Sequence, residues 1–236
     1  MSVLIIAHRA CPQHAPENSI EGIRRAAELG AGGVEVDVQR TLDGVPVLMH
    51  DWTLGRTAGL PFPVRLLPYA LVRRLRLKGG AERVPSLAQA LDALPDGLLI
   101  ALEIKHASAT GAVIAALRRR GLESRAVIWS PHAAAVRYAA GAAPEIGSSL
   151  LRDVRSPAGL RRFLDDAVRY GARGVSIHWR AVTSALVAEA HARNLKVYSL
   201  SPDVDSTVAN VACGLDGAIT DWPAEVRAAL SRGSRR

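Results

Sequence analysis

The stretch VEVDVQRTLDGVPVLMHD, residues 34–51, decides the fold, because it joins two strand-like runs through a tight turn. Side chains two positions apart on a strand share a face, so Glu35 and Asp37 lie on the same side. If Leu42-Asp43 forms the centre of the turn, paired positions sum to about 85 and His50 falls opposite Glu35. A bulge would shift this register by one residue and could turn the His50 side chain to the other face.

Ionisable residues also end two other strand-like runs. The run 3–7 is followed by His8-Arg9, and the run 98–102 is followed by Glu103 and Lys105. Strands that are covered by helices are normally apolar on both faces, so ionisable groups there need partners. Hard oxygen ligands, such as the carboxylates of residues 35, 37 and 103, suit Mg²⁺ or Ca²⁺.

Strand-like and helix-like runs alternate along almost the whole chain, with eight of each. This rhythm predicts an α/β fold, a (β/α)₈ TIM barrel, in which the carboxyl ends of all strands share one face. Pro46, in the strand that returns from the turn, indicates an edge strand. The expected strands are 3–7, 33–38, 98–104, 125–129, 145–150, 173–177, 195–200 and 216–220, and the expected helices are 19–29, 86–94, 110–120, 131–140, 157–170, 181–193, 205–212 and 223–230.

Residues 51–84 interrupt the rhythm with three prolines and a Gly-Gly pair. The segment is too short for a domain with a core of its own. We expect a small insertion after the second strand and its hairpin, above the barrel mouth, within a single barrel domain of residues 1–231. Residues 232–236 are expected to form a disordered basic tail.

Composition limits the classes of function. The 236-residue chain has a net charge of +8, and 27 of its 30 basic residues are Arg. These arginines are dispersed without an aromatic ladder, which argues against nucleic-acid binding. No apolar run reaches the roughly 20 residues of a membrane span, so stable membrane insertion is not expected. No signal peptide is visible and the two cysteines form no redox or metal spacing, so we expect a cytoplasmic protein.

The charged residues at the strand ends have the chemistry of phosphodiester cleavage. Two histidines exchange protons near neutral pH, and a cation with Arg9 neutralises a phosphate. One of His8 and His50 would activate the attacking oxygen, and the other would protonate the leaving oxygen. Taken singly, each residue also has a structural explanation: Glu35 and Asp37 as the polar face of an edge strand, or Glu103 and Lys105 as an ion pair.

Nine short motifs in order closely resemble the glycerophosphodiester phosphodiesterase family, and the resemblance spans nearly the whole chain. It implies a barrel enzyme that hydrolyses small-molecule glycerophosphodiesters to glycerol 3-phosphate and an alcohol with a divalent cation, Mg²⁺ or Ca²⁺. The motifs are His8-Arg9, Pro16-Glu17-Asn18-Ser19, Val34-Glu35-Val36-Asp37-Val38, Thr41-x-Asp43-Gly44, His50-Asp51, Arg56-Thr57, Val84-Pro85-Ser86-Leu87, Leu102-Glu103-Ile104-Lys105 and Gly217-Ala218-Ile219-Thr220-Asp221.

The resemblance also implies roles for individual residues. It makes His8 and His50 the catalytic acid/base pair, Glu35, Asp37 and Glu103 the metal ligands, and Arg9 and Lys105 the groups that bind the substrate phosphate.

The chain departs from the family pattern at a few positions. Ala10 replaces the usual glycine, which matters only if that position has a positive φ. Ser130-Pro131 and Tyr198-Ser199 replace motifs that line the substrate side, so the headgroup preference is open. Asn18 is expected to cap the first helix.

Two other functions remain open beside hydrolysis of soluble glycerophosphodiesters. One is a lysophospholipase D-type phosphodiesterase, and the other is a non-catalytic barrel that binds a phosphate ligand. Since the insertion offers few apolar residues, the sequence favours water-soluble diesters over lysophospholipids.

Overall fold

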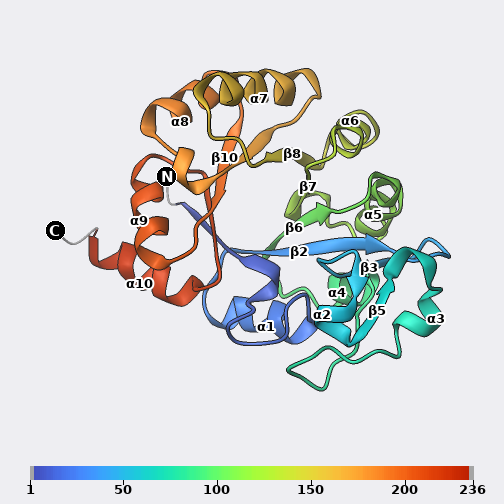
Figure 1. Ribbon diagram of the computed structural model, residues 1–236. Coiled ribbons are helices and arrows are strands. Elements are labelled where there is room, and N and C mark those ends of the chain that lie inside the picture. Colours follow the sequence, from blue (N-terminus) through green and yellow to red (C-terminus); the bar gives the residue numbers. More distant parts are fainter. Residues whose placement is uncertain (1–2, 234–236) are drawn as a thin grey trace.

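Eight parallel strands close into a barrel in the computed structural model, which describes residues 3–233 (Figure 1). The order around the barrel is β1, β11, β10, β9, β8, β7, β6 and β2, and pairing of β1 with β2 closes it. All eight expected strands are present, and each end lies within two residues of its expected position. They are β1 (Leu4–Ala7), β2 (Gly33–Arg40), β6 (Leu99–Ile104), β7 (Ala126–Ser130), β8 (Gly147–Arg152), β9 (Gly174–Ile177), β10 (Lys196–Leu200) and β11 (Gly217–Thr220).

Eight helices surround the barrel, and local sequence explains where several of them begin. Ser19 caps α1 by accepting a hydrogen bond from the Gly22 amide, and Ser86 and Gln89 form a capping box at α4. The prediction that Asn18 caps the first helix is therefore wrong. The helices are α1 (Ile20–Glu28), α4 (Leu87–Asp92), α5 (Thr110–Arg118), α6 (Ala133–Ala142), α7 (Pro157–Arg169), α8 (Ser184–His191), α9 (Val204–Ala212) and α10 (Pro223–Gly233).

The core lies in two layers, one between the sheet and the helices and one inside the barrel. The outer layer is almost wholly aliphatic. The inner layer contains Ile6, Ala101, Trp129, Tyr198 and Ile219. The rings of Trp129 and Tyr198 lie 5.0 Å apart between centroids, so two aromatic side chains fill the barrel below its mouth.

The hairpin after β2 has a register one residue away from the predicted one. β3 (Pro46–Leu48) pairs antiparallel with β2, with Val38 opposite Leu48. The loop has three residues instead of two. The Gly44 amide donates a hydrogen bond to the Thr41 carbonyl, and Gly44 then adopts φ +86°, which adds the third residue to the loop. β3 lies at the end of the strand order, as Pro46 predicted.

Residues 51–84 form a compact lobe beside β3. It contains β4 (Thr53–Leu54), α2 (Gly55–Ala58), β5 (Leu60–Pro63) and α3 (Tyr69–Val72). A small apolar cluster that includes Leu54, Val64 and Val72 joins it to β3. Figure 1 shows this lobe below β2, with α3 extending past the carboxyl end of that strand.

At the C-terminus, α10 continues to Gly233, so residues 232–233 are helical and not disordered as predicted; residues 234–236 lie outside the described part of the chain. Within residues 3–233, no helix combines the length and the apolar character that crossing a bilayer demands.

Candidate active site

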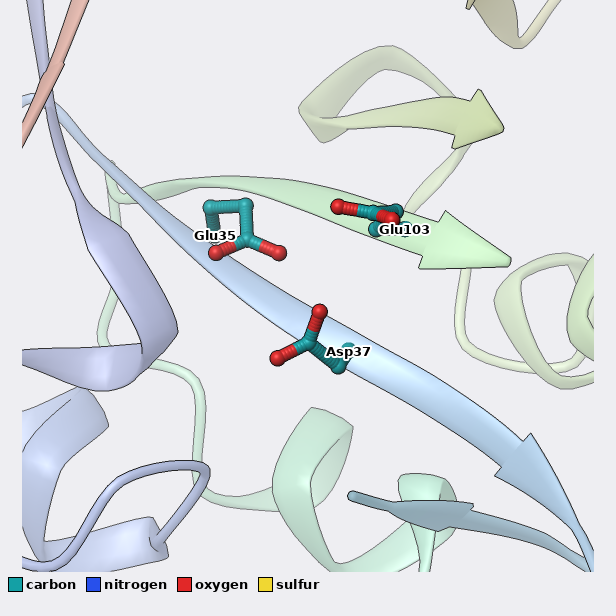
Figure 2. Close-up of side chains that lie close together, drawn as sticks. All are labelled: Glu35, Asp37 and Glu103. Atoms are coloured by element: carbon teal, nitrogen blue, oxygen red, sulfur yellow. The ribbon is translucent and has the colours of Figure 1, made fainter. Parts of the chain in front are cut away.

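Three carboxylates converge at the carboxyl ends of two neighbouring strands. Asp37 on β2 is the register partner of Glu103 on β6, and Glu35 lies two residues earlier on the same face of β2. Figure 2 shows the three side chains directed toward one another. One oxygen from each lies within 4.8 Å of the others. All the donors are carboxylate oxygens, which is the chemistry that Mg²⁺ and Ca²⁺ prefer.

Glu35 is the most constrained of the three. Its side chain is 2% exposed, and the Arg9 amide donates a hydrogen bond of 2.9 Å to its Oε2. Its Oε1 is buried without a hydrogen-bond partner. Burial first, and then the negative charges of Asp37 and Glu103, raise the pKa of Glu35 well above its usual value. A buried carboxylate with an unpartnered oxygen is costly, and a bound cation would remove that cost.

Asp37 is stabilised in its charged form. Burial alone would raise the pKa of Asp37, but the charge of Lys105 and hydrogen bonds outweigh burial and lower it. Lys105 Nζ lies 2.8 Å from Asp37 Oδ1 and also contacts Glu103. The Asn18 side chain bonds Asp37 twice, donating through Nδ2 to Oδ2 and accepting from the Asp37 amide, both at 2.8 Å. Asn18 therefore fixes this carboxylate instead of capping α1.

Each of the two predicted catalytic histidines has a carboxylate at Nδ1. His8 Nδ1 lies 2.8 Å from Asp221 Oδ1, and His50 Nδ1 lies 2.8 Å from Asp51 Oδ1. When the carboxylate accepts a hydrogen bond from Nδ1–H, the free lone pair of a neutral imidazole is on Nε2. Both rings thus keep Nε2 available for proton exchange.

The hairpin register places His50 opposite Val36, one residue away from the predicted level of Glu35. The Met49 amide donates to the Asp37 carbonyl at 3.0 Å, which places His50 directly after that level. The charge of His50 also contributes to the lowered pKa of Asp37. The one-residue correction in the hairpin register therefore keeps His50 beside the carboxylates.

An arginine network supports the His50 side of the site. Arg56 donates to Asp51 through Nε at 2.6 Å and to both oxygens of Glu17. The hydrogen bonds from Arg56 lower the pKa of Asp51 to about 2. The Asp51 carboxylate thus stays charged, and it orients His50 across the whole range in which a histidine titrates.

The loop that carries Arg9 has an unusual backbone. Arg9, Ala10 and Cys11 all have positive φ, at 43°, 57° and 64°. Left-handed backbone at a residue other than glycine costs about 1–2 kcal/mol. Replacement of the usual glycine by Ala10 therefore does affect the backbone. The Asn18 amide holds the loop by donating to the Arg9 carbonyl at 2.8 Å.

An apolar groove opens at the same face of the barrel. It has a volume of about 440 Å³ and follows the carboxyl ends of β8, β9 and β10. Leu151, Ile177, Trp179 and Leu200 line it together with Arg152. Pro131, which departs from the family pattern, also lines the groove. Tyr198, which departs from it as well, lies below the groove in the barrel interior.

Direct contacts or shared partners link six of the seven side chains singled out from the sequence, and the seventh, His8, directly precedes Arg9, whose amide bonds Glu35. Sequence reasoning gave no separate role to three more, Asp51, Arg56 and Asp221, and it gave Asn18 only the role of a helix cap. Asp221 follows an apolar strand, and Asp51 adjoins His50, so the strand-end criterion could have found both. Only the folded chain identifies the partner of Asn18.

The chain is similar to known proteins along most of its length. The model of the glycerophosphoryl diester phosphodiesterase family matches residues 8–225. A glycerophosphodiester phosphodiesterase from Caldanaerobacter subterraneus subsp. tengcongensis is 29% identical over 94% of this chain and 96% of its own.

Two solved structures share the fold. A protein from Silicibacter pomeroyi, proposed to be a glycerophosphoryl diester phosphodiesterase, has a TM-score of 0.87 and 27% identity over 98% of this chain and 94% of its own. An Oleispira antarctica phosphodiesterase in complex with the product sn-glycerol-3-phosphate has a TM-score of 0.87 and 24% identity over 96% of each chain. The present chain is an enzyme and belongs to the glycerophosphoryl diester phosphodiesterase family.

Proposed function

We propose that this chain hydrolyses glycerophosphodiesters to glycerol 3-phosphate and an alcohol, with His8 and His50 as the acid/base pair and a divalent cation held by Glu35, Asp37 and Glu103. The observation that carries the proposal is the pairing of each histidine with a carboxylate beside the cluster of three acidic side chains. The product complex of the Oleispira antarctica protein gives the same class of product.

Hydrolysis needs a proton removed from the attacking oxygen and a proton delivered to the leaving alcohol. Asp221 and Asp51 hold the two imidazoles at Nδ1, so Nε2 of one ring takes up the first proton and Nε2 of the other supplies the second. Both carboxylates also favour the imidazolium that forms after proton uptake.

The negative charge of the phosphate requires positive charge around it. When bound, Mg²⁺ or Ca²⁺ would act as a Lewis acid at the phosphoryl oxygens. Lys105 already lies among the carboxylates, and the pKa of Lys105 is raised because the charges of Asp37 and Glu103 overcome the opposing effect of burial. Arg9 Nε makes no hydrogen bond and lies 3.6 Å from Asp37 Oδ2, so the Arg9 guanidinium adds positive charge beside the acidic cluster, where the phosphate would bind.

The test is release of glycerol 3-phosphate from a panel of glycerophosphodiesters, measured with and without a chelator. The chain offers a matched control, because His191 and Asp216 form another pair 2.8 Å apart at the opposite end of the barrel. Activity should fall strongly in His50→Ala and stay at the wild-type level in His191→Ala. Equal activity in both variants would contradict the assignment of His50.

The groove at the mouth favours a second candidate substrate, a lysophospholipid. Water-soluble diesters were expected as substrates because the insertion offers few apolar residues. The groove lies outside the insertion and provides an apolar wall for an acyl chain. Leu200→Ser should then lower kcat/KM for lysophosphatidylcholine but not for glycerophosphocholine. Val168→Ser on α7 replaces another exposed aliphatic side chain and serves as the control. An unchanged kcat/KM for the lysophospholipid in Leu200→Ser would leave glycerophosphodiesters as the substrate class.

A further inference from the structure

Exposed apolar side chains gather on one lobe of the molecule. Within residues 3–233, nine large apolar side chains are exposed, and six of them lie between positions 42 and 71. Trp52 is 57% exposed and Phe62 is 42% exposed, although both belong to residue types that normally pack. We call the six the docking face: Leu42, Trp52, Leu60, Phe62, Leu66 and Leu71.

Backbone hydrogen bonds and a cation–π contact connect parts of the docking face. The Leu42 amide at the hairpin tip donates to the Leu67 carbonyl at 2.9 Å, which places the tip beside Leu66. The Val64 amide donates to the Trp52 carbonyl at 3.1 Å. The guanidinium of Arg65 lies over the Trp52 ring, 5.7 Å from its centroid. The hairpin tip, the end of β5 and the turn before α3 therefore lie side by side on this lobe.

The same lobe carries most of the net positive charge. Residues 40–83 contain eight basic and three acidic residues, which gives +5 of the total of +8. The acidic ones are engaged: Asp51 with Arg56, Asp43 with the Tyr69 amide, and Glu82 with the start of α1. By contrast, Arg65, Arg73 and Arg74 are exposed and form no ion pair within the described part of the chain.

The combination of exposed apolar side chains and unpaired arginines favours one kind of binding partner over others. A second copy of the chain would bring one basic face against another, which like-charge repulsion opposes. A nucleic acid would use the arginines but would gain nothing from four exposed leucines. Apolar side chains surrounded by arginines match the boundary between acyl chains and headgroups in a membrane that contains anionic lipids. We propose that the docking face binds the surface of such a membrane, without insertion of a spanning segment.

The docking face adjoins the candidate active site. Trp52 follows His50 and Asp51 directly in the chain, and Arg56 joins the lobe to the His50 side of the site. Docking would therefore hold the barrel mouth close to the lipid surface. This consequence rests on the proposed function, whereas membrane binding itself does not.

The experiment is cosedimentation of the full chain with phosphatidylcholine vesicles that contain or lack phosphatidylserine. Wild-type protein should bind the anionic vesicles, and binding should weaken as salt is raised. The variant Arg73→Glu/Arg74→Glu should lower the partition by more than about tenfold. Its matched control is Arg161→Glu/Arg162→Glu, an exposed pair on α7 with the same change in charge, which should bind like wild type.

A second variant tests the apolar part. Phe62→Ser/Leu66→Ser should also lower the partition by about tenfold, because it removes apolar area that enters the interface. Hydrolysis of a glycerophosphodiester in vesicle-free solution should stay at the wild-type level in every variant. If the proposed function were wrong, the wild type would be inactive in this assay and would still bind vesicles.

Three results would overturn the inference. The first is equal vesicle binding by the two arginine variants. The second is retention on duplex DNA that depends on the arginines but not on Phe62 and Leu66. The third is a concentration-dependent dimer, seen by light scattering, that Phe62→Ser/Leu66→Ser abolishes.

Discussion

Replacing Glu35 with Gln should stabilise the cation-free protein and abolish its response to a cation. The Glu35 carboxylate faces two others within 4.8 Å, and each like-charge contact at that distance costs about 3.5 kcal/mol at an effective dielectric constant of about 20. Lys105 offsets roughly one of these contacts, which leaves a cost of about 3.5 kcal/mol. Gln is neutral, and it still accepts the Arg9 amide hydrogen bond.

Thermal unfolding in EDTA at pH 8 measures this cost. For a chain of this size, about 3.5 kcal/mol corresponds to a rise in Tm of roughly 7–14 °C. Mg²⁺ or Ca²⁺ at a hundred times its Kd should stabilise the wild-type protein by about 2.7 kcal/mol and so raise its Tm. The Tm of Glu35→Gln should not change when the cation is added. Glu28→Gln removes an exposed carboxylate and should stay within about 0.5 kcal/mol of wild type.

The pH dependence follows from the raised pKa of Glu35. Between the ordinary carboxyl pKa and the raised value, the folded chain holds a proton that the unfolded chain has lost, so wild-type stability falls as pH rises. The advantage of Glu35→Gln should therefore shrink as pH falls toward about 4.3, where the unfolded glutamate also takes up its proton. A Tm below that of wild type in EDTA at pH 8 would refute the reasoning.

Four further outcomes test the site. His8→Ala and His50→Ala should each lower kcat by about 10²–10⁴-fold, and the double variant should lose far less than the product of the two factors; wild-type turnover in either single variant would remove that residue from the mechanism. Exhaustive chelation should abolish hydrolysis and added Mg²⁺ or Ca²⁺ should restore it, so full activity in the chelated enzyme would contradict the cation requirement. Asn18→Ala leaves a buried amide and a carboxylate oxygen of Asp37 unpaired, and should weaken cation affinity by about 10–100-fold in calorimetry; unchanged affinity would make Asn18 purely structural. Asp221→Asn removes the carboxylate that holds Nδ1–H of His8, so kcat should fall while KM changes little; a change in KM alone would point to substrate binding instead.

The strand ends are where the sequence was most informative. An apolar run that stops at a charged residue identified His8, Glu35, Asp37 and Glu103, because buried strands do not tolerate such groups without a function or a partner. Strand and helix positions followed from hydrophobic periodicity and capping residues, which act within a few positions of the chain. These local signals were sufficient for the barrel.

The errors involve choices that local sequence leaves open. The turn at Leu42 can close with two or three loop residues, and the choice depends on Gly44 adopting a left-handed backbone. Asn18 has the chemistry of a helix cap, but its amide pairs with Asp37, nineteen residues along the chain. The exposure of Trp52 also could not be read from sequence, because a tryptophan after a strand is equally compatible with packing.

The close approach between the Arg9 loop and α1 limits which residues position 22 can accept. A Cβ at Gly22 would lie 1.9 Å from the Ala10 carbonyl oxygen, so any side chain there forces the loop to move. Helix propensity alone ranks Gly22→Ala as a gain of about 1 kcal/mol. The loop, however, carries the Arg9 amide that holds Glu35. In a saturation-mutagenesis screen, position 22 should therefore tolerate almost nothing, although it touches neither the acidic cluster nor either histidine.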